Sequence, residues 1–362
     1  MVTPSRIALA RKRRGLTLAE LSARAGVSLQ SLSNYETGRT APRSDTLAKI
    51  ATALEFPASF FAGSALDELP CEGISWRARS KTSTRVLDAA RAAGTLGAML
   101  YDWIDERFRL PAVDVPSLGK PDPETAAGMV RTRWGLGEAP APNMVHLLEA
   151  HGVRVFSLDP DHAEVDAFAV WRDGVPFVFL NTLKSAERGR FDAAHELGHL
   201  VMHGSEHACS GPEAERQANE FASAFLMPRA SVLGHMPSGA HLDQILRGKR
   251  IWKVSAMALT YRMHDLGLLT DWQYRSTCAE LSRLGYRSDE PEGMGQRETS
   301  QVLTKVFAAL RTKHVRPSGV AAELGLTSEE MNRLLFGLTL TSLAGSGQQD
   351  TSTAKRNLSV VS

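Results

Sequence analysis

Two histidines and a glutamate in the segment FDAAHELGHLVMHG, residues 191–204, have the types and the spacing of a metal-hydrolase site. His195 and His199 are four residues apart, so a helix places both imidazoles on one face, where they can bind one cation. Glu196 directly follows the first histidine and is placed to accept a proton from a water molecule on that cation. The segment therefore predicts a helix that carries two metal ligands and a general base.

A catalytic zinc ion needs a third protein ligand and one open coordination position. His203 is a poor choice, because it lies about 12 Å beyond His195 along a continuous helix; we expect it to be a partly buried polar end of the helix. Glu215 is the better choice, since a second helix that crosses the first can return its carboxylate. Glu213 is the competitor on another face of that segment. Asn219, one turn after Glu215, could support the site from behind the ligands.

The sequences RFDAAHELGHLVMH and EAERQANEFASAFLMP together resemble the ImmA/IrrE family of metallopeptidases, and the sequence ERGRF and the preceding strand pattern match as well. The resemblance covers about residues 75–290. It implies a zincin-like fold in which His195, His199 and Glu215 bind zinc and Glu196 is the general base. It also implies a regulatory protease that cleaves repressors of the XRE type and releases genes for the stress response or for mobile-element transfer.

The first 60 residues are basic, with nine Lys or Arg against four acidic residues, in a chain whose net charge is only +2. The sequence TLAELSARAGVSLQSLSNYETGRTAPRSDTLAKIATAL has apolar residues at helical spacing, with Thr17 and Ser28 at N-cap positions. Gly26 is expected to make the turn, and Ala23 and Leu32 to pack the helix pair. The sequence resembles the helix-turn-helix of phage repressors and the XRE family of regulators, which implies binding to double-stranded DNA.

A helix of this kind presents its N-terminal residues to base edges in the major groove. By alignment with that family, the base-facing residues are Ser28, Leu29, Gln30, Ser33 and Asn34, and the phosphate-facing residues are Arg11, Arg39 and Arg43. Gln and Asn pair bidentately with adenine, whereas phosphate contacts give affinity without sequence information. We expect a homodimer on a palindromic operator; a domain that docks proteins instead of DNA is the alternative.

The remaining patterns predict a mostly α protein with a small β-sheet. The expected domains are an all-α helix-turn-helix domain at 1–65, a helical linker at 66–118, an α+β zincin-like peptidase domain at 119–235, a helical C-terminal domain at 236–344 and a disordered tail at 345–362. Residues 167–171 and 177–180 flank the sequence RDGV and predict a hairpin with Asp173 and Gly174 in its turn. Its strands are candidates for holding an extended peptide substrate by strand addition.

The cysteine count and the hydropathy argue against secreted and membrane classes. Cys71, Cys209 and Cys278 are far apart and form no CxxC pair, which fits a reducing cytosol better than a disulfide framework. No apolar run approaches the roughly 18 residues of a membrane span, and the N-terminus lacks the apolar region of a signal peptide. We therefore expect a cytoplasmic protein without a membrane partner.

These patterns together predict a zinc-dependent endopeptidase with its own sequence-specific DNA-binding domain, with Mn²⁺ as the other suitable ion. The expected partners are operator DNA and a protein substrate, namely a repressor of the XRE type. The alternative is a transcriptional regulator whose zincin-like domain senses a metal or a peptide without proteolysis. Glu196 favours the enzyme, because a site that only binds metal would not need a general base.

Overall fold

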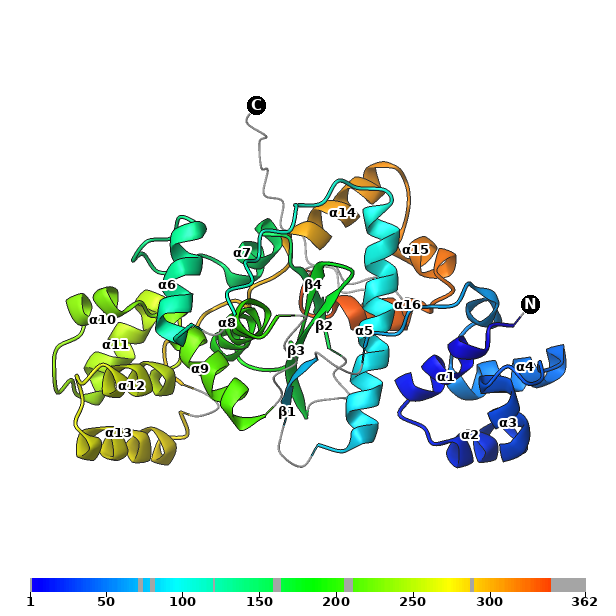
Figure 1. The fold of residues 1–362 in the computed structure, drawn as a ribbon, viewed down its shortest axis with the longest axis horizontal. Helices are drawn as coiled ribbons and strands as arrows, with labels where there is room; N and C mark the ends of the chain where they lie inside the picture. Colours follow the sequence, from blue (N-terminus) through cyan, green and yellow to red (C-terminus); the bar gives the residue numbers. More distant parts are fainter. Residues whose placement is uncertain are drawn as a thin grey trace, which may run out of the picture.

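The computed structural model describes residues 2–70, 74–78, 82–119, 121–158, 164–204, 211–286 and 290–339 (Figure 1). This part of the chain holds sixteen α-helices, one short 3-10 helix and a four-stranded sheet. The predicted fold class, mostly α with a small β-sheet, is confirmed. No helix in the described ranges is both long and apolar enough to span a membrane. Cys71, Cys209 and the tail at 345–362 lie outside the described residues.

Capping residues and glycine set the bounds of the N-terminal helices. They are α1 (Pro4–Arg13), α2 (Leu18–Ala25), α3 (Leu29–Glu36), α4 (Ser44–Leu54) and the 3-10 helix η1 (Ala58–Ala62). Thr17 and Glu20 form a capping box at the start of α2, and Gly26 ends that helix in the left-handed conformation with φ of 62°. Leu32 is buried as expected, but the expectation for Ala23 was wrong, because Ala23 is exposed and Ala25 is the buried alanine.

The sheet has the strand order β1-β3-β4-β2. Its strands are β1 (Ser75–Ala78), β2 (Arg154–Ser157), β3 (Val165–Arg172) and β4 (Val175–Leu180). The predicted hairpin is confirmed, since β3 and β4 are antiparallel and both turn residues, Asp173 and Gly174, have positive φ. However, β3 pairs with β1 and β4 pairs with β2, so neither hairpin strand has a free edge for a substrate. The expectation that they hold a peptide is therefore corrected.

The sheet lies between two long helices, α5 (Thr84–Asp105) and α8 (Ala186–Met202) (Figure 1). Glycines let α5 approach the sheet closely, because a Cβ at Gly97 would lie 2.9 Å from the Phe179 ring and one at Gly94 would lie 3.0 Å from the Phe168 ring. Helix α8 packs on β3 and β4. Both β1 and α5 fall in the segment that we expected to be a helical linker, and both belong to this layered unit.

The other helices surround this layered core. They are α6 (Pro123–Arg133), α7 (Met144–Ala150), α9 (Pro212–Leu226), α10 (Arg229–His235), α11 (Leu242–Trp252), α12 (Ala256–Asp265), α13 (Asp271–Arg283), α14 (Gln301–Thr312), α15 (Pro317–Glu323) and α16 (Ser328–Leu335). Helix α9 packs between α8 and α6, while α16 packs against β2 and α5. Late segments of the chain therefore complete the packing of the sheet layer.

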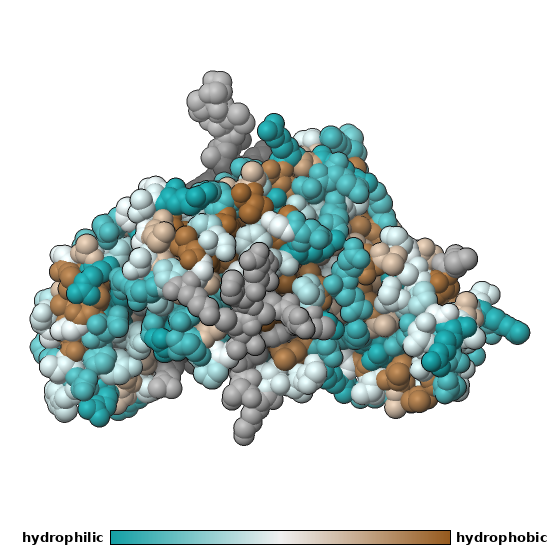
Figure 2. Space-filling view, in the orientation of Figure 1, coloured by the Kyte–Doolittle hydropathy of each residue, from teal (hydrophilic) through white to brown (hydrophobic). Residues whose placement is uncertain are grey.

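The N-terminal helices are docked onto the rest of the protein through α1, which packs along α5. Arg13 Nε lies 2.5 Å from Glu330 Oε1, and Arg14 Nη1 lies 2.8 Å from Glu330 Oε2, with Arg13 and Glu330 each only 1% exposed. Gly325 packs tightly against the backbone of η1, because a Cβ at this position would lie 2.9 Å from Phe60 Cα. In the face that Figure 2 shows, the surface of these helices is a mixture of hydrophilic, intermediate and hydrophobic residues.

Candidate functional site

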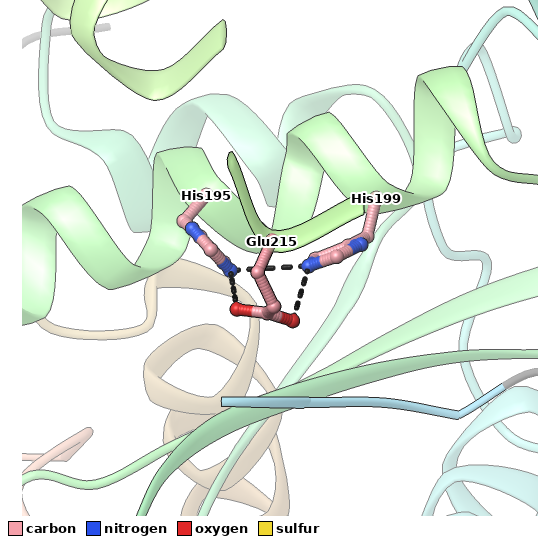
Figure 3. A group of neighbouring side chains, drawn as sticks. All are labelled: His195, His199 and Glu215. Atoms are coloured by element: carbon pink, nitrogen blue, oxygen red, sulfur yellow. Dashed lines mark hydrogen bonds and ion pairs between the residues drawn. The ribbon is translucent and has the colours of Figure 1, made fainter. Parts of the chain in front are cut away.

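Three predicted metal ligands come together between α8 and α9 (Figure 3). His195 Nε2 lies 3.1 Å from His199 Nε2 and 3.4 Å from Glu215 Oε2. His199 Nε2 lies 3.2 Å from Glu215 Oε1. Both imidazoles are buried, whereas the Glu215 side chain is 37% exposed and forms the solvent side of the group. The two histidines of α8 and the glutamate of the crossing helix α9 therefore meet as the sequence led us to expect.

Asn219 determines which nitrogen of His195 carries the proton. The Asn219 Nδ2 donates to the carbonyl oxygen of Glu215 at 2.8 Å, so its Oδ1 is the atom that faces His195 Nδ1 at 3.1 Å. An amide oxygen only accepts, so His195 Nδ1 must donate the proton. In the neutral imidazole this leaves Nε2 as a bare acceptor that points into the group.

A longer chain of hydrogen bonds determines which nitrogen of His199 carries the proton. Gln217 Nε2 donates to the Glu213 carboxylate at 2.9 Å, which turns Gln217 Oε1 towards His203 Nε2 at 3.0 Å. His203 Nε2 therefore donates, and in the neutral ring its Nδ1 accepts from His199 Nδ1 at 2.9 Å. The Nε2 of His199 is then also a bare acceptor.

The two imidazole nitrogens and the two Glu215 oxygens that face one another are thus all acceptors, which is an unfavourable arrangement unless a cation lies among them. Burial lowers the pKa of His195 to about 3, which keeps its ring in the neutral form that binds metals. Burial alone would raise the pKa of Glu215, but the neighbouring His195 and His199 hold it well below its usual value, so this side chain is a carboxylate. Two imidazoles and a carboxylate fit a zinc ion and leave a fourth position open.

Close packing of α8 on α9 brings Glu215 to the histidines. A Cβ at Gly198 would lie 3.0 Å from Phe221 Cδ1 and 3.2 Å from Phe221 Cβ, so only glycine permits this approach without a shift. Ser185 caps the start of α8, and Pro212 occupies the first turn of α9. Glu196 is fully buried on α8, directly after His195.

The predicted DNA-contacting residues begin at the exposed start of α3 and continue along it to the partly exposed Ser33 and Asn34. Ser28 caps this helix by accepting from the Ser31 amide, and Leu29 is 50% exposed. Gln30 Nε2 donates to Asn34 Oδ1 at 3.2 Å on the helix surface, and Ser33 is partly exposed beside them. These side chains are placed on one accessible helix end, as a helix that enters the major groove requires.

The three arginines expected to face phosphates do not have the same surroundings. Arg39 and Arg43 are exposed. Arg11 instead forms a two-point ion pair with Glu36, with Nε 2.7 Å from Oε1 and Nη2 2.9 Å from Oε2, and its Nη1 donates to the Leu16 carbonyl. The hydrogen bond with Glu36 raises the pKa of Arg11. The expected phosphate contact by Arg11 is therefore corrected, because its guanidinium is used within the domain.

Comparison with known families gives two matches. Residues 148–264 match the IrrE N-terminal-like domain, a peptidase family, and residues 7–61 match the helix-turn-helix family. None of the curated proteins compared with the chain matches it significantly. The chain joins a helix-turn-helix domain to an IrrE-like peptidase domain. This is the arrangement expected from the sequence.

The IrrE-like match includes both helices of the candidate metal centre, α8 and α9. Two predicted alternatives are outside the group of three ligands. Glu213 is 65% exposed and pairs with Arg216 on the outer side of α9. His203 contacts His199 through its ring, which is a more specific role than the polar helix end that we expected.

Two charged residues beside the candidate metal centre were not predicted. Asp192 is buried on α8, and burial raises its pKa to about 6. Arg77 on β1 lies with its Nε 3.1 Å from Asp192 Oδ1. Asp192 could have been recognised from the sequence, because it lies four residues before Glu196 and therefore on the same helix face. No local pattern indicates Arg77, which precedes the motif by more than a hundred residues.

Proposed function

We propose that the protein is a zinc-dependent endopeptidase held at DNA by its own helix-turn-helix domain. The observation that carries this proposal is the convergence of acceptor atoms from His195, His199 and Glu215 beside the buried Glu196. Hydrogen bonds behind both imidazoles support the same conclusion, since they orient the two bare nitrogens into the group. A site built only for structure would use a fourth protein ligand.

The residues of the site have distinct roles in peptide hydrolysis. When bound, zinc lowers the pKa of water to about 7 and polarises a carbonyl group. Glu196 accepts the proton of the attacking water and returns it to the leaving amine nitrogen. Asn219 and His203 keep the two metal-binding nitrogens deprotonated. Mn²⁺ is the other ion that we propose for this nitrogen and oxygen ligand set.

The edge of the sheet beside the site offers a place for the substrate backbone. In the described part of the sheet, β1 pairs only with β3, so its other edge is free. Strand β1 contacts α8 through Arg77, and Figure 3 shows it running past the Glu215 carboxylate. An extended peptide that adds to this edge would place its backbone beside the Glu215 carboxylate, which fits cleavage within a chain.

We further propose that the substrate is a repressor of the XRE type and that its cleavage releases genes for the stress response or for mobile-element transfer. The helix-turn-helix match supports DNA binding by this chain. An enzyme and a substrate on neighbouring DNA sites have a raised effective concentration. Two copies of this chain on a palindrome, with half-sites about one helical turn apart, would form the homodimer expected on an operator.

A digest of the repressors encoded beside the gene tests the catalytic proposal. The wild-type protein is expected to cleave one of them with Zn²⁺ or Mn²⁺, and not after chelation. Glu196→Gln is expected to bind the same amount of metal and to cleave at least about 10²-fold more slowly, because the amide cannot accept the proton of water. Undiminished cleavage by Glu196→Gln contradicts the mechanism. Metal binding without cleavage in the wild type favours a sensor.

A titration of the intact protein on its own upstream DNA tests the operator proposal. Gln30→Ala and Asn34→Ala are each expected to cost about 1–3 kcal/mol on the specific sequence and little on unrelated DNA. Gln30 is exposed and Asn34 is partly exposed on α3, which supports this expectation. Equal binding to every fragment, or binding to none, would make the domain a docking surface for the partner repressor.

A further inference from the structure

Arg85, near the start of α5, lies beside the first turn of α2 although it belongs to the other part of the chain. Its Nη1 donates to Glu20 Oε1 at 3.0 Å. A Cβ at Gly15, in the turn between α1 and α2, would lie 3.5 Å from Arg85 Nε. The lower end of α5 accordingly lies next to α2 in Figure 1. An arginine from outside the helix-turn-helix match at 7–61 therefore extends the surface of that domain.

The capping box at the start of α2 holds Glu20 in place and, through it, Arg85. Glu20 Oε2 accepts from the Thr17 amide at 2.7 Å, so its Oε1 is the atom that faces Arg85. The Arg85 side chain is 51% exposed, and its contact with Glu20 is the one hydrogen bond that it donates to a residue in the described ranges. A guanidinium has five N–H groups. Those that Glu20 does not use can therefore bind a partner that approaches from solvent.

The ion pair of Arg85 with Glu20 does little to hold the fold together. Both side chains are exposed, by 51% and 42%, and surface ion pairs of this kind have little effect on the stability of a protein. Arg91, further along α5, shows how an arginine that supports the fold is placed. It is only 12% exposed, and its Nη2 lies 3.8 Å from Glu68 and 3.4 Å from Asp88. Arg85 instead presents its charge at the surface.

The place of Arg85 corresponds to the path of the DNA backbone past a helix-turn-helix. In such complexes the second helix enters the major groove and the first helix crosses the sugar–phosphate backbone. These two helices are α3 and α2 in this protein. Arg39 and Arg43 follow the end of α3, whereas Arg85 lies at the start of α2. Exposed cations are therefore present at both ends of the helix pair, and the one at α2 is supplied by α5.

We infer that Arg85 binds a phosphate of the DNA backbone, so that the peptidase part of the chain takes part in DNA binding. The inference rests on the proposed DNA binding by α3 and extends the contact surface beyond the helix-turn-helix domain. The guanidinium of arginine matches the geometry of a phosphate group, and such a contact adds affinity without sequence information. It requires the docked arrangement in which α1 packs along α5, because this packing brings Arg85 to α2.

The test compares Arg85→Ala, Arg85→Lys and the matched control Arg107→Ala in the full-length protein. Arg107 lies about 33 Å further along the same helix axis and also pairs with a carboxylate of another segment, Glu323, at 2.6 Å. Anisotropy titrations use the upstream DNA of the gene and an unrelated duplex over a range of salt concentrations. Arg85→Ala should weaken binding to both duplexes about 5–10-fold at about 0.1 M salt and lower the salt slope by about 0.9. Arg85→Lys should keep the slope, and Arg107→Ala should match the wild type.

A double-mutant cycle with Glu20→Gln separates a phosphate contact from simple neutralisation of Glu20. Glutamine at this position keeps the capping box of α2 but removes the charge. In the Glu20→Gln background, Arg85→Ala should still lower the salt slope by about 0.9. An effect that disappears in this background, a loss confined to one DNA sequence, or equal binding by Arg85→Ala and Arg107→Ala overturns the inference. A wild-type protein that binds neither duplex overturns the proposed DNA binding instead.

Discussion

The metal centre and the N-terminal domain use charged groups in opposite ways. In the metal centre, two imidazole nitrogens and a carboxylate face one another as acceptors, and their supporting residues lie within 24 positions along the chain. In the N-terminal domain, the cations of the basic run at 11–14 face carboxylates. Lys12 pairs with Glu68, and Arg13 and Arg14 pair with Glu330.

This difference shows that a count of basic residues does not tell which of them are exposed and able to contact DNA. The excess of positive charge in the first 60 residues indicated a surface for DNA. Much of it is instead used to dock the domain, and Arg6 is also buried, with its Nε and Nη1 donating to the carbonyl oxygens of Ser64 and Phe60. The exposed cations that remain, such as Arg39 and Arg43, lie near α3 and are the ones left to contact phosphates.

The largest effect is expected from removing a metal ligand. Glu215→Ala or His195→Ala should lose the single divalent ion per chain during dialysis, because two protein ligands rarely hold zinc tightly. His203→Ala should keep the ion but bind it about 10–100-fold more weakly, since His199 loses the acceptor that orients it. Glu220→Ala on the same helix is the control that keeps the ion at full affinity, because Glu220 pairs with Arg216 and not with this chain of hydrogen bonds. Metal analysis after dialysis checks this, and full occupancy in Glu215→Ala would assign the third ligand elsewhere.

The docking network should give the next largest effect. Glu330→Gln leaves Arg13 and Arg14 without their shared carboxylate, and breaking a buried pair in this way costs about 3–5 kcal/mol. Glu55→Gln is the matched control, because Glu55 is 72% exposed and lies 3.6 Å from Arg14. Urea unfolding and limited proteolysis between the two domains measure the effect. Similar stability of both variants would mean that the network does not dock the domain.

Gly198→Ala tests the close approach of α8 and α9 that brings Glu215 to the histidines. The added methyl group must displace Phe221, which we expect to cost about 1–3 kcal/mol and to weaken metal binding. Gly128→Ala on α6 is the control, because its Cβ would meet no atom within 4 Å. That exposed substitution should stabilise the protein by about 0.5–1 kcal/mol. If the two variants bind metal equally well, the approach does not define the site.

The smallest effects concern the exposed arginines near α3. Arg39→Ala and Arg43→Ala should each weaken binding to all DNA sequences alike and lower the salt dependence by about one ion. Arg11→Ala should instead lower the melting temperature, because Glu36 loses its two-point partner. Anisotropy titrations at two salt concentrations, with a thermal melt of each variant, separate these outcomes. An unchanged melt for Arg11→Ala would return it to the phosphate contacts.

Local spacing explains why the sequence predicted so much of the metal centre. Residues four apart on a helix must share a face, so the placing of His195 and His199 depends on α8 alone. The contact between His195 and Asn219 was also predictable once Glu215 was chosen, because Asn219 is one turn further along α9.

Contacts between distant segments explain what the sequence did not predict. Strand β1 has four residues, too few for a clear alternating pattern, and the place of Arg77 depends on its pairing with β3. The partner of Arg13 is 317 residues away, and no local periodicity indicates such a pair. The hairpin at β3 and β4 was recognised from its turn, but its two outer neighbours, which remove its free edges, come from other parts of the chain.

The pairing of Arg13 with Glu330 also fixes an order of events during biosynthesis. The N-terminal helices leave the ribosome early and contain the buried residues for a small core of their own. Their docking partner is translated 317 residues later. Helix α5 is made much earlier and can already pack on α1, but Arg13 and Arg14 have no shared carboxylate until Glu330 is present. The buried ion pairs of the N-terminal helices are thus completed only when α16 has been made, after the contact of α1 with α5 has become possible.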